Sequence, residues 1–174
     1  EGVASGRMEI SLASLSWMKR LARLMEAGYV LTIDYGYVSA DGKCRSDGTL
    51  RGFWEHRLSG DVLARPGEQD VTADVNFAML VREGEKRGLR PILLERQREF
   101  LLRLGILDEL VADVTDPLSL EARKNRTIRQ IVFDETGMGS RFFVLLQAKN
   151  VAVPRQLQGL NRTFFLDNAL RIGL

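Results

Sequence analysis

The sequence has very little of the residues that form disulfides and metal clusters. Among 174 residues there is one cysteine, Cys44, and one histidine, His56. A lone cysteine excludes an internal disulfide, and these two residues cannot supply the sulfur and imidazole ligands of a zinc site. The acidic spacing of a calcium-binding loop is also absent. We therefore expect no metal site, and the cysteine content favours a reducing compartment.

Long apolar runs and a secretory signal segment are missing too, so we expect neither a membrane protein nor a secreted one. The composition is 45% hydrophobic and 28% charged with a net charge of +2, which is typical of one globular domain. The most basic stretch, residues 122–129, contains no aromatic residue. It is interpreted as a solvated helix face, and no nucleic-acid partner is expected.

Short signatures of catalysis and of nucleotide binding are absent as well. No G-x-S-x-G sequence occurs, so the nucleophile turn of an α/β-hydrolase is not present. The G-x-G of Gly137 to Gly139 precedes a predicted strand, whereas a phosphate-binding turn joins a strand to a helix. It is interpreted as a tight turn, and no cofactor-binding residue is predicted in this chain.

What the sequence does contain is an alternation of helical and strand-like segments. Helices are predicted at residues 10–26, 75–87, 98–111 (broken at Gly105) and 117–134. Strands are predicted at 29–34, 90–97 and 141–149, and in part of 49–58. Gly28 is expected to cap the first helix, and Pro117 to lie in the first turn of the last. The alternation indicates an α/β fold with a mostly parallel sheet whose strands are buried on both faces.

A run of alternating polar residues precedes the second predicted helix. Within RPGEQDVTADVNF, residues 65–77, every second position from 68 is polar: Glu68, Asp70, Thr72, Asp74 and Asn76. Asp74 or Thr72 is expected to cap the helix, where an acid also suits the helix dipole. Asp70 lies too far before the helix for capping alone to explain it.

Polar residues also follow two predicted strands. Asp34 and Tyr35 end the first, and Glu95 and Gln97 end the second. In a doubly wound sheet, ligands bind beyond the carboxyl ends of the strands, so this edge is the candidate site. Taken singly, each of these residues is equally explained as a cap, a turn residue or a solvent-facing side chain, and His56 as a structural histidine.

Six segments in order resemble the MidA-like methyltransferase family. They are residues 6–17 (GRMEIS with Trp17), 28–37 (GYVLTIDYGY), 49–58 (TLRGFWEHRL), 65–77, 96–106 and 138–146. Within the fourth segment, Asp70, Thr72, Ala73, Val75 and Phe77 match a D-x-T-A-x-V-x-F signature, whereas Asn76 stands where the family more often has Asp. The resemblance fades beyond about residue 150, so residues 1–150 are assigned to the methyltransferase domain and 151–174 to a tail of uncertain structure.

The resemblance implies a Rossmann-like class I fold and a methyltransferase that uses S-adenosylmethionine, with a protein arginine as acceptor in mitochondrial members. The family's E-L-G-P-G-R-G donor motif is absent, so the chain looks like the C-terminal half of such an enzyme, without a donor site of its own. Residues 29–34, 91–96 and 141–148 would then be the fifth, sixth and seventh strands, the seventh antiparallel between the other two.

The same resemblance suggests which residues face the methyl acceptor. Asp70 and Asp34 are candidates for holding an arginine, and His56 for removing a proton. The other side chains expected along the acceptor cleft are Tyr35, Arg51, Thr72 and Gln97.

The expected partners are the missing N-terminal half, a protein substrate, and a second copy of the chain that pairs with a bare strand edge. The expected location is the bacterial cytoplasm, or the mitochondrial matrix in a eukaryote. The alternative is a non-catalytic binding or assembly module that keeps the half-fold.

Overall fold

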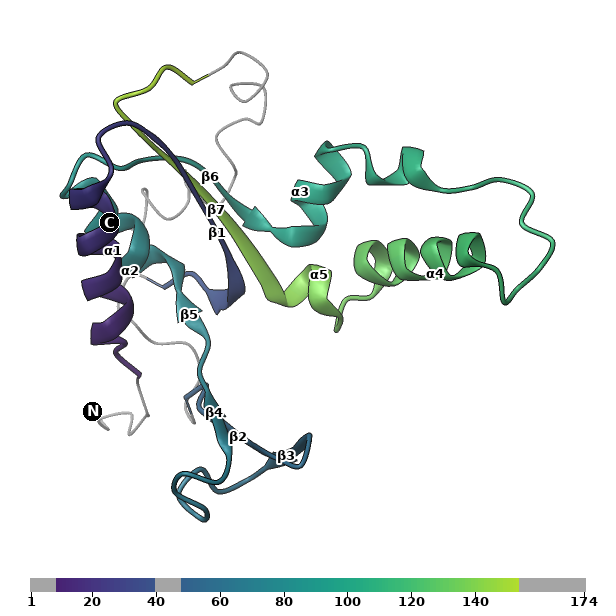
Figure 1. Cartoon of the computed structure of the whole chain (residues 1–174), viewed down its shortest axis with the longest axis horizontal. Helices are drawn as coiled ribbons and strands as arrows, with labels where there is room; N and C mark the ends of the chain where they lie inside the picture. The colour runs from purple at the N-terminus through teal and green to yellow at the C-terminus, as the bar shows by residue number, and fades with distance from the viewer. Residues whose placement is uncertain (1–8, 40–47, 154–174) are drawn as a thin grey trace, which may run out of the picture.

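The computed structural model describes residues 9–39 and 48–153 (Figure 1). The elements in chain order are α1 (Leu12–Leu24), β1 (Gly28–Tyr37), β2 (Arg51–Trp54), β3 (Arg57–Ser59), β4 (Asp70–Thr72), β5 (Val75–Asn76), α2 (Phe77–Glu85), β6 (Arg90–Arg96), α3 (Gln97–Arg103), the 3₁₀ helix η1 (Ile106–Glu109), α4 (Leu120–Phe133), α5 (Met138–Arg141) and β7 (Phe142–Lys149). Cys44 and the tail from 154 lie outside the described residues.

Three parts are visible in Figure 1: a central sheet with α1 and α2 beside it, a small sheet of β2 to β4 that extends from its end, and an arm that runs from α3 to α5. In the described residues, no helix has both the length and the apolar character needed to cross a bilayer.

The central sheet is mixed, with strand order β5-β1-β7-β6. β7 runs antiparallel to β1 over eight paired positions, from Gly28 with Lys149 to Tyr35 with Phe142, and antiparallel to β6 on its other side. This confirms the strand placement that the family resemblance implied. The prediction of mostly parallel pairing is wrong, because β1 with β5 is the one parallel pair in the described part of the chain. A central antiparallel strand that is covered on both faces has the same apolar composition as a parallel one.

One face of the sheet is closed by α1 and α2. Met18 of α1 and Phe77 of α2 are fully buried against Phe143 and Leu145 of β7. The Phe77 and Phe143 ring centres are 5.4 Å apart. This cluster forms the hydrophobic core, and each fully buried apolar side chain in it contributes roughly 1.5–3 kcal/mol by leaving water.

β1 is buried on one face only, contrary to the prediction of a strand covered on both. Val30 faces the core with 7% of its surface exposed. The side chains that alternate with it are 41–53% exposed: Tyr29, Leu31, Ile33 and Tyr35. The outer edge of β1 pairs with β5 at Gly36 and Tyr37 alone among the described residues. The sequence therefore has the apolar character of a strand with two covered faces, whereas α1 and α2 cover one.

Helix ends differ from prediction at three places. Asn76, and not Asp74 or Thr72, caps α2, since its Oδ1 accepts a hydrogen bond from the Ala78 amide at 3.1 Å. Gly28 does not cap α1, which ends at Leu24 with Met25 as its C-cap; its φ of +141° places it at the start of β1. α4 begins at Leu120 after the Ser119 cap, so Pro117 precedes the helix. The predicted break at Gly105 is confirmed, because this residue has a φ of +82° between α3 and η1.

Candidate functional site

The small sheet has the strand order β3-β2-β4 and carries several of the predicted site residues. β2 and β3 form a hairpin in which Trp54 pairs with Arg57. The two residues between them, Glu55 and His56, have φ values of +47° and +62°, as in a type I′ turn. Such turns usually contain Asn or Gly, so the sequence gives no strong signal for this one. His56 consequently lies at the tip of the hairpin.

The central part of the alternating polar run forms strand β4 of this small sheet, and the run ends at Asn76, the cap of α2. β4 pairs with β2, so that Asp70 lies opposite Phe53 and Thr72 opposite Arg51. All three residues of β4 are exposed, and the period of two reflects a strand with Asp70 and Thr72 on one face. The two polar residues that follow have other roles. Asp74 forms contacts that join the small sheet to its neighbours, and Asn76 caps α2.

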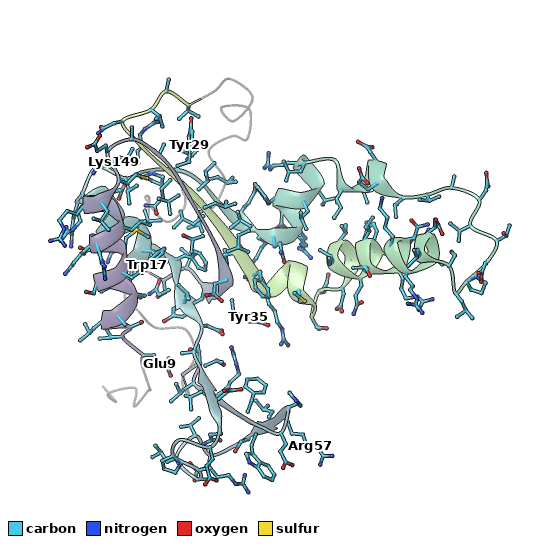
Figure 2. The ribbon with its side chains drawn as sticks, viewed as in Figure 1. Glu9, Trp17, Tyr29, Tyr35, Arg57 and Lys149 are labelled. Carbon is cyan, nitrogen blue, oxygen red and sulfur yellow. The ribbon has the colours of Figure 1, made fainter. Side chains whose placement is uncertain are left out.

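A hydrogen-bonded junction joins α1, the small sheet and α2. The Glu9 carboxylate accepts bonds from the Thr49 amide at 2.9 Å and its hydroxyl at 3.2 Å, and from the Leu50 amide at 3.3 Å. The Asp74 amide donates to the Thr49 hydroxyl at 3.0 Å. Thr49 is 1% exposed, so its polar atoms depend on these partners. Three segments of the family pattern therefore meet at one point, where Glu9 lies between α1 and the small sheet (Figure 2).

Arg51 extends the junction to the end of β1. Its Nη2 lies 2.6 Å from Asp74 Oδ1, and both side chains are partly buried. The Arg51 guanidinium carbon lies 5.9 Å from the centre of the Tyr35 ring, which in turn lies 4.1 Å from the Phe142 ring. The structure thus brings Tyr35 and Arg51 together, with Thr72 beside Arg51 across the strand pair. These contacts orient the small sheet relative to the central one.

A groove of about 510 Å³ runs along the small sheet. It is lined by Phe53, Glu55, His56, Gly67, Glu68, Gln69 and Asp70. Asp70 and His56 therefore share one groove with two further carboxylates that the sequence analysis did not assign to the site. None of the three carboxylates forms an ion pair with another described residue. The groove has an excess of negative charge, which suits a guanidinium or ammonium group.

Asp34 and Gln97 lie at the end of the central sheet. Asp34 pairs with Phe143, which pairs on its other side with Arg96, the residue before Gln97. The two predicted residues are therefore about two strand spacings apart, roughly 10 Å. Asp34 Oδ1 accepts a hydrogen bond from the Tyr35 amide at 2.8 Å, whereas Gln97 Oε1 is buried and has no hydrogen-bond partner.

Glu95 is a buried acid beside this edge. The sequence predicts it at the end of a strand but does not assign it to the site. Glu95 is 2% exposed, and its Oε2 accepts a bond from Arg103 Nε at 3.0 Å. Burial raises the pKa of the Glu95 carboxyl, and the Arg103 guanidinium partly opposes this shift. Arg96 next to it stacks on Phe143, with its guanidinium carbon 4.0 Å from the ring centre. In the described part of the chain, no group of three or more His, Cys, Asp or Glu side chains is arranged to hold a metal ion.

Comparison with known proteins identifies the family. A family model described as "Putative S-adenosyl-L-methionine-dependent methyltransferase" matches residues 3–93, more than half of the chain. The chain therefore belongs to this methyltransferase family, as its resemblance to the MidA-like proteins predicted.

Curated relatives agree with this assignment. The chain is 40% identical over 136 residues to the rat mitochondrial protein arginine methyltransferase NDUFAF7, and 36% identical over 133 residues to the human protein of that name. These matches include 74% and 70% of this chain but span 29% and 27% of the relatives.

Two crystal structures of Burkholderia thailandensis proteins share the fold. Both are 28% identical in sequence, with TM-scores of 0.73 and 0.68, and the matches cover 85% and 83% of this chain but 40% and 38% of theirs. The second of these proteins is bound to S-adenosyl-homocysteine.

Proposed function

We propose that this chain forms the acceptor side of an S-adenosylmethionine-dependent methyltransferase and that the acceptor is an arginine of a protein. The observation that carries the proposal is the acidic groove of the small sheet, in a chain of this family. The groove contains two of the residues proposed as catalytic, His56 and Asp70. The rat and human relatives are named protein arginine methyltransferases, which supports the choice of acceptor.

The chemistry assigned to the groove is binding and deprotonation of the acceptor. A guanidinium group is planar and presents several N–H donors, so carboxylates spread along a groove can hold it by charge-assisted hydrogen bonds. Asp70, with Glu55 and Glu68 beside it, is assigned this role. His56 is placed in the same groove, where an imidazole can accept the proton that a methylated nitrogen loses. Asp34 stays a candidate for holding the acceptor at the sheet edge.

S-Adenosylmethionine supplies the methyl group in this family, but the described residues do not fit it. Donor binding in Rossmann-like folds uses a glycine-rich turn between a strand and a helix. In the described part of the chain, the two strand-to-helix turns, at Asn76 before α2 and at Arg96 before α3, contain no glycine. We assign donor binding to a part of the complete enzyme outside this chain.

The exposed apolar surfaces of β1 and α1 support the proposal that this chain is the C-terminal half of a larger enzyme. Among the described residues, β5 pairs with the outer edge of β1 at Gly36 and Tyr37 alone. The outer face of β1 carries the exposed side chains of Tyr29, Leu31, Ile33 and Tyr35. Three further exposed apolar residues, Ile10, Trp17 and Leu24, are spaced by seven and lie along one side of α1 and its N-terminal flank. In our proposal the N-terminal half of the enzyme pairs with this edge and covers both surfaces.

A binding or assembly module that lacks catalysis is the second candidate. It is favoured by the missing glycine turn, because such a module needs no donor site. The coding sequence upstream of Glu1 separates the two candidates: a glycine-rich donor motif there supports the enzyme, and a start codon immediately before Glu1 supports the module. If the complete enzyme is eukaryotic, we propose the mitochondrial matrix as its location, which the mitochondrial relatives support. If it is bacterial, we propose the cytoplasm.

The acceptor groove is tested by binding of a labelled peptide with one arginine between glycines, measured by fluorescence anisotropy. Glu68→Gln with Asp70→Asn should weaken binding about tenfold, because the guanidinium then binds two neutral amides in place of two carboxylates. Glu135→Gln is the control, since Glu135 is exposed on the distant arm. Equal binding by the double variant and the control would refute the assignment.

A further inference from the structure

A second groove lies at the opposite end of the central sheet and plays no part in the acceptor site. It has a volume of about 750 Å³ and is lined by Ser16, Lys19, Arg20, Ala22, Arg23, Arg87 and Lys149. The lining comes from α1, from the turn after α2 and from the last residue of β7. Figure 2 shows Lys149 beside α1, far along the sheet from Tyr35. β7 pairs Lys149 with Gly28 at one end of β1, whereas the small sheet that carries the acceptor groove contacts Tyr35 near the other end through Arg51.

This groove is strongly cationic. Five of the seven described residues that line it are Lys or Arg, and none of the seven is an acid. The one carboxylate in ion-pair contact with these cations within the described residues is Glu83, which lies 3.1 Å from Arg87 and 3.9 Å from Lys19. Glu83 is also within 3.8 Å of Lys86, so a single negative charge is shared by three cations.

Two arginines of the groove have no counter-ion at all among the described residues. Arg20 and Arg23 are exposed on the second half of α1, and neither forms a hydrogen bond or an ion pair with a described side chain. On a helix, positions three apart are neighbours, so both guanidinium groups lie on one side of α1. Like charges so placed repel each other, and an anion between them would relieve that repulsion.

The geometry distinguishes between kinds of anion. A compact phosphate site converges backbone N–H groups at a helix N-terminus. Here the C-terminal half of α1 faces the groove, and Lys149 Nζ already donates to the Ala22 carbonyl. The carbonyl end of a helix disfavours a single concentrated negative charge. The cations are instead distributed over three elements, which matches several carboxylates spaced along an extended chain.

The other polyanions fit the lining less well. Single-stranded nucleic acid needs aromatic side chains on which bases stack, and none of the described lining residues is aromatic. A membrane-binding surface needs apolar side chains that enter the bilayer, and Ala22 is the one apolar residue among the described residues of this lining. An acidic peptide needs neither feature.

We propose that this basic groove is a docking site for an acidic segment of a partner protein, whose Asp and Glu side chains pair with Arg20, Arg23, Lys19 and Arg87. The site is separate from the acceptor groove in place and in charge. A partner could therefore be held at one end of the sheet while a basic acceptor binds at the other.

The test is titration of this chain into a fluorescein-labelled hexaglutamate peptide, followed by anisotropy at low and at physiological salt. We expect saturable binding that weakens as salt increases. Arg20→Glu with Arg23→Glu should weaken binding about tenfold or more, since two of the four cations assigned to the peptide are reversed in charge. The matched control is Arg123→Glu with Arg129→Glu, which makes the same charge change on the exposed face of α4 and should change binding about twofold at most.

Circular dichroism should show that all variants are folded, and Arg20→Gln with Arg23→Gln provides a milder pair if the charge reversal disturbs α1. Three outcomes would overturn the proposal: no saturable hexaglutamate binding, an equal loss in the α4 control pair, or Arg20- and Arg23-dependent binding of phosphatidylserine vesicles or oligouridine that is tighter than that of the peptide. The arginine-peptide assay should be unchanged in these variants, so failure here and failure of the acceptor groove are separate results.

Discussion

The two faces of β1 both carry apolar side chains, but they differ in how far these side chains are buried. On the covered face, Val30 is 7% exposed and packs with Phe143 and Leu145 beneath α1 and α2. On the open face, Leu31 and Ile33 are 53% and 43% exposed, although both are as apolar as Val30. An apolar side chain gains stability only when it leaves water, so the open face contributes little to this chain by itself. The apolar composition of this open face is explained if another layer covers it, as we propose for a chain that forms half of the enzyme.

The largest effect is expected on the covered face. Leu145 has no exposed surface in the centre of the core, and Leu145→Ala removes its apolar contacts and leaves a cavity that α1 and α2 can only partly fill. We expect the free energy of unfolding to fall by about 2–5 kcal/mol, as measured by urea denaturation. A loss below about 1 kcal/mol would show that the core is less well packed than described.

A pH-dependent effect is expected at Glu95, where the arm covers the far side of β6. Because burial raises its pKa, the folded protein holds the Glu95 proton to a higher pH than the unfolded chain does. The stabilising contribution is therefore full below the ordinary value of 4.5 and is lost as pH rises through the folded pKa.

Glu95→Gln stays neutral at every pH, so the stability of the wild type relative to this variant should decrease from pH 4 to pH 7 in urea titrations. A relative stability that increases over this range would contradict the account. It would show that the ion pair with Arg103 outweighs the cost of burial.

The smallest effect on stability is expected on the open face. Leu31→Thr with Ile33→Thr keeps strand-forming side chains, so the free energy of unfolding should change by less than about 1 kcal/mol. Self-association should weaken clearly, because copies are expected to pair through the apolar face of β1 and through its edge, which β5 pairs with only at Gly36 and Tyr37 among the described residues.

Sedimentation velocity measures the association, and Leu118→Thr with Leu120→Thr is the control, since both leucines are 77% exposed on the arm. A chain that is monomeric at high concentration, or a control pair that weakens association equally, would contradict this explanation.

Periodicity and family pattern predicted three of the four strands of the central sheet, because β1, β6 and β7 are apolar segments that each follow a helix. The fourth strand, β5, was not predicted, since Val75 and Asn76 fall within the helix predicted at residues 75–87. The position of β7 came from the resemblance, since an apolar strand does not reveal the direction of its neighbours. The small sheet was harder to predict. Its strands are short, β4 is exposed throughout, and the Glu55–His56 turn lacks the usual turn residues.

The candidate site could be predicted only in part, because its groove depends on the same short strands and on the same hairpin turn. Asp70 and His56 were selected by resemblance, and the structure places them in one groove. Glu55 and Glu68 join them because of the strand register and the hairpin turn, neither of which was assigned from the sequence. The Glu9 contact with Thr49 joins residues forty apart, which periodicity cannot detect.

The central claim is that the donor site lies outside these residues, and calorimetric titration of the chain with S-adenosylmethionine tests it most directly. The account predicts heats no larger than those of dilution, with no saturation. A saturable isotherm with one molecule bound per chain would contradict it.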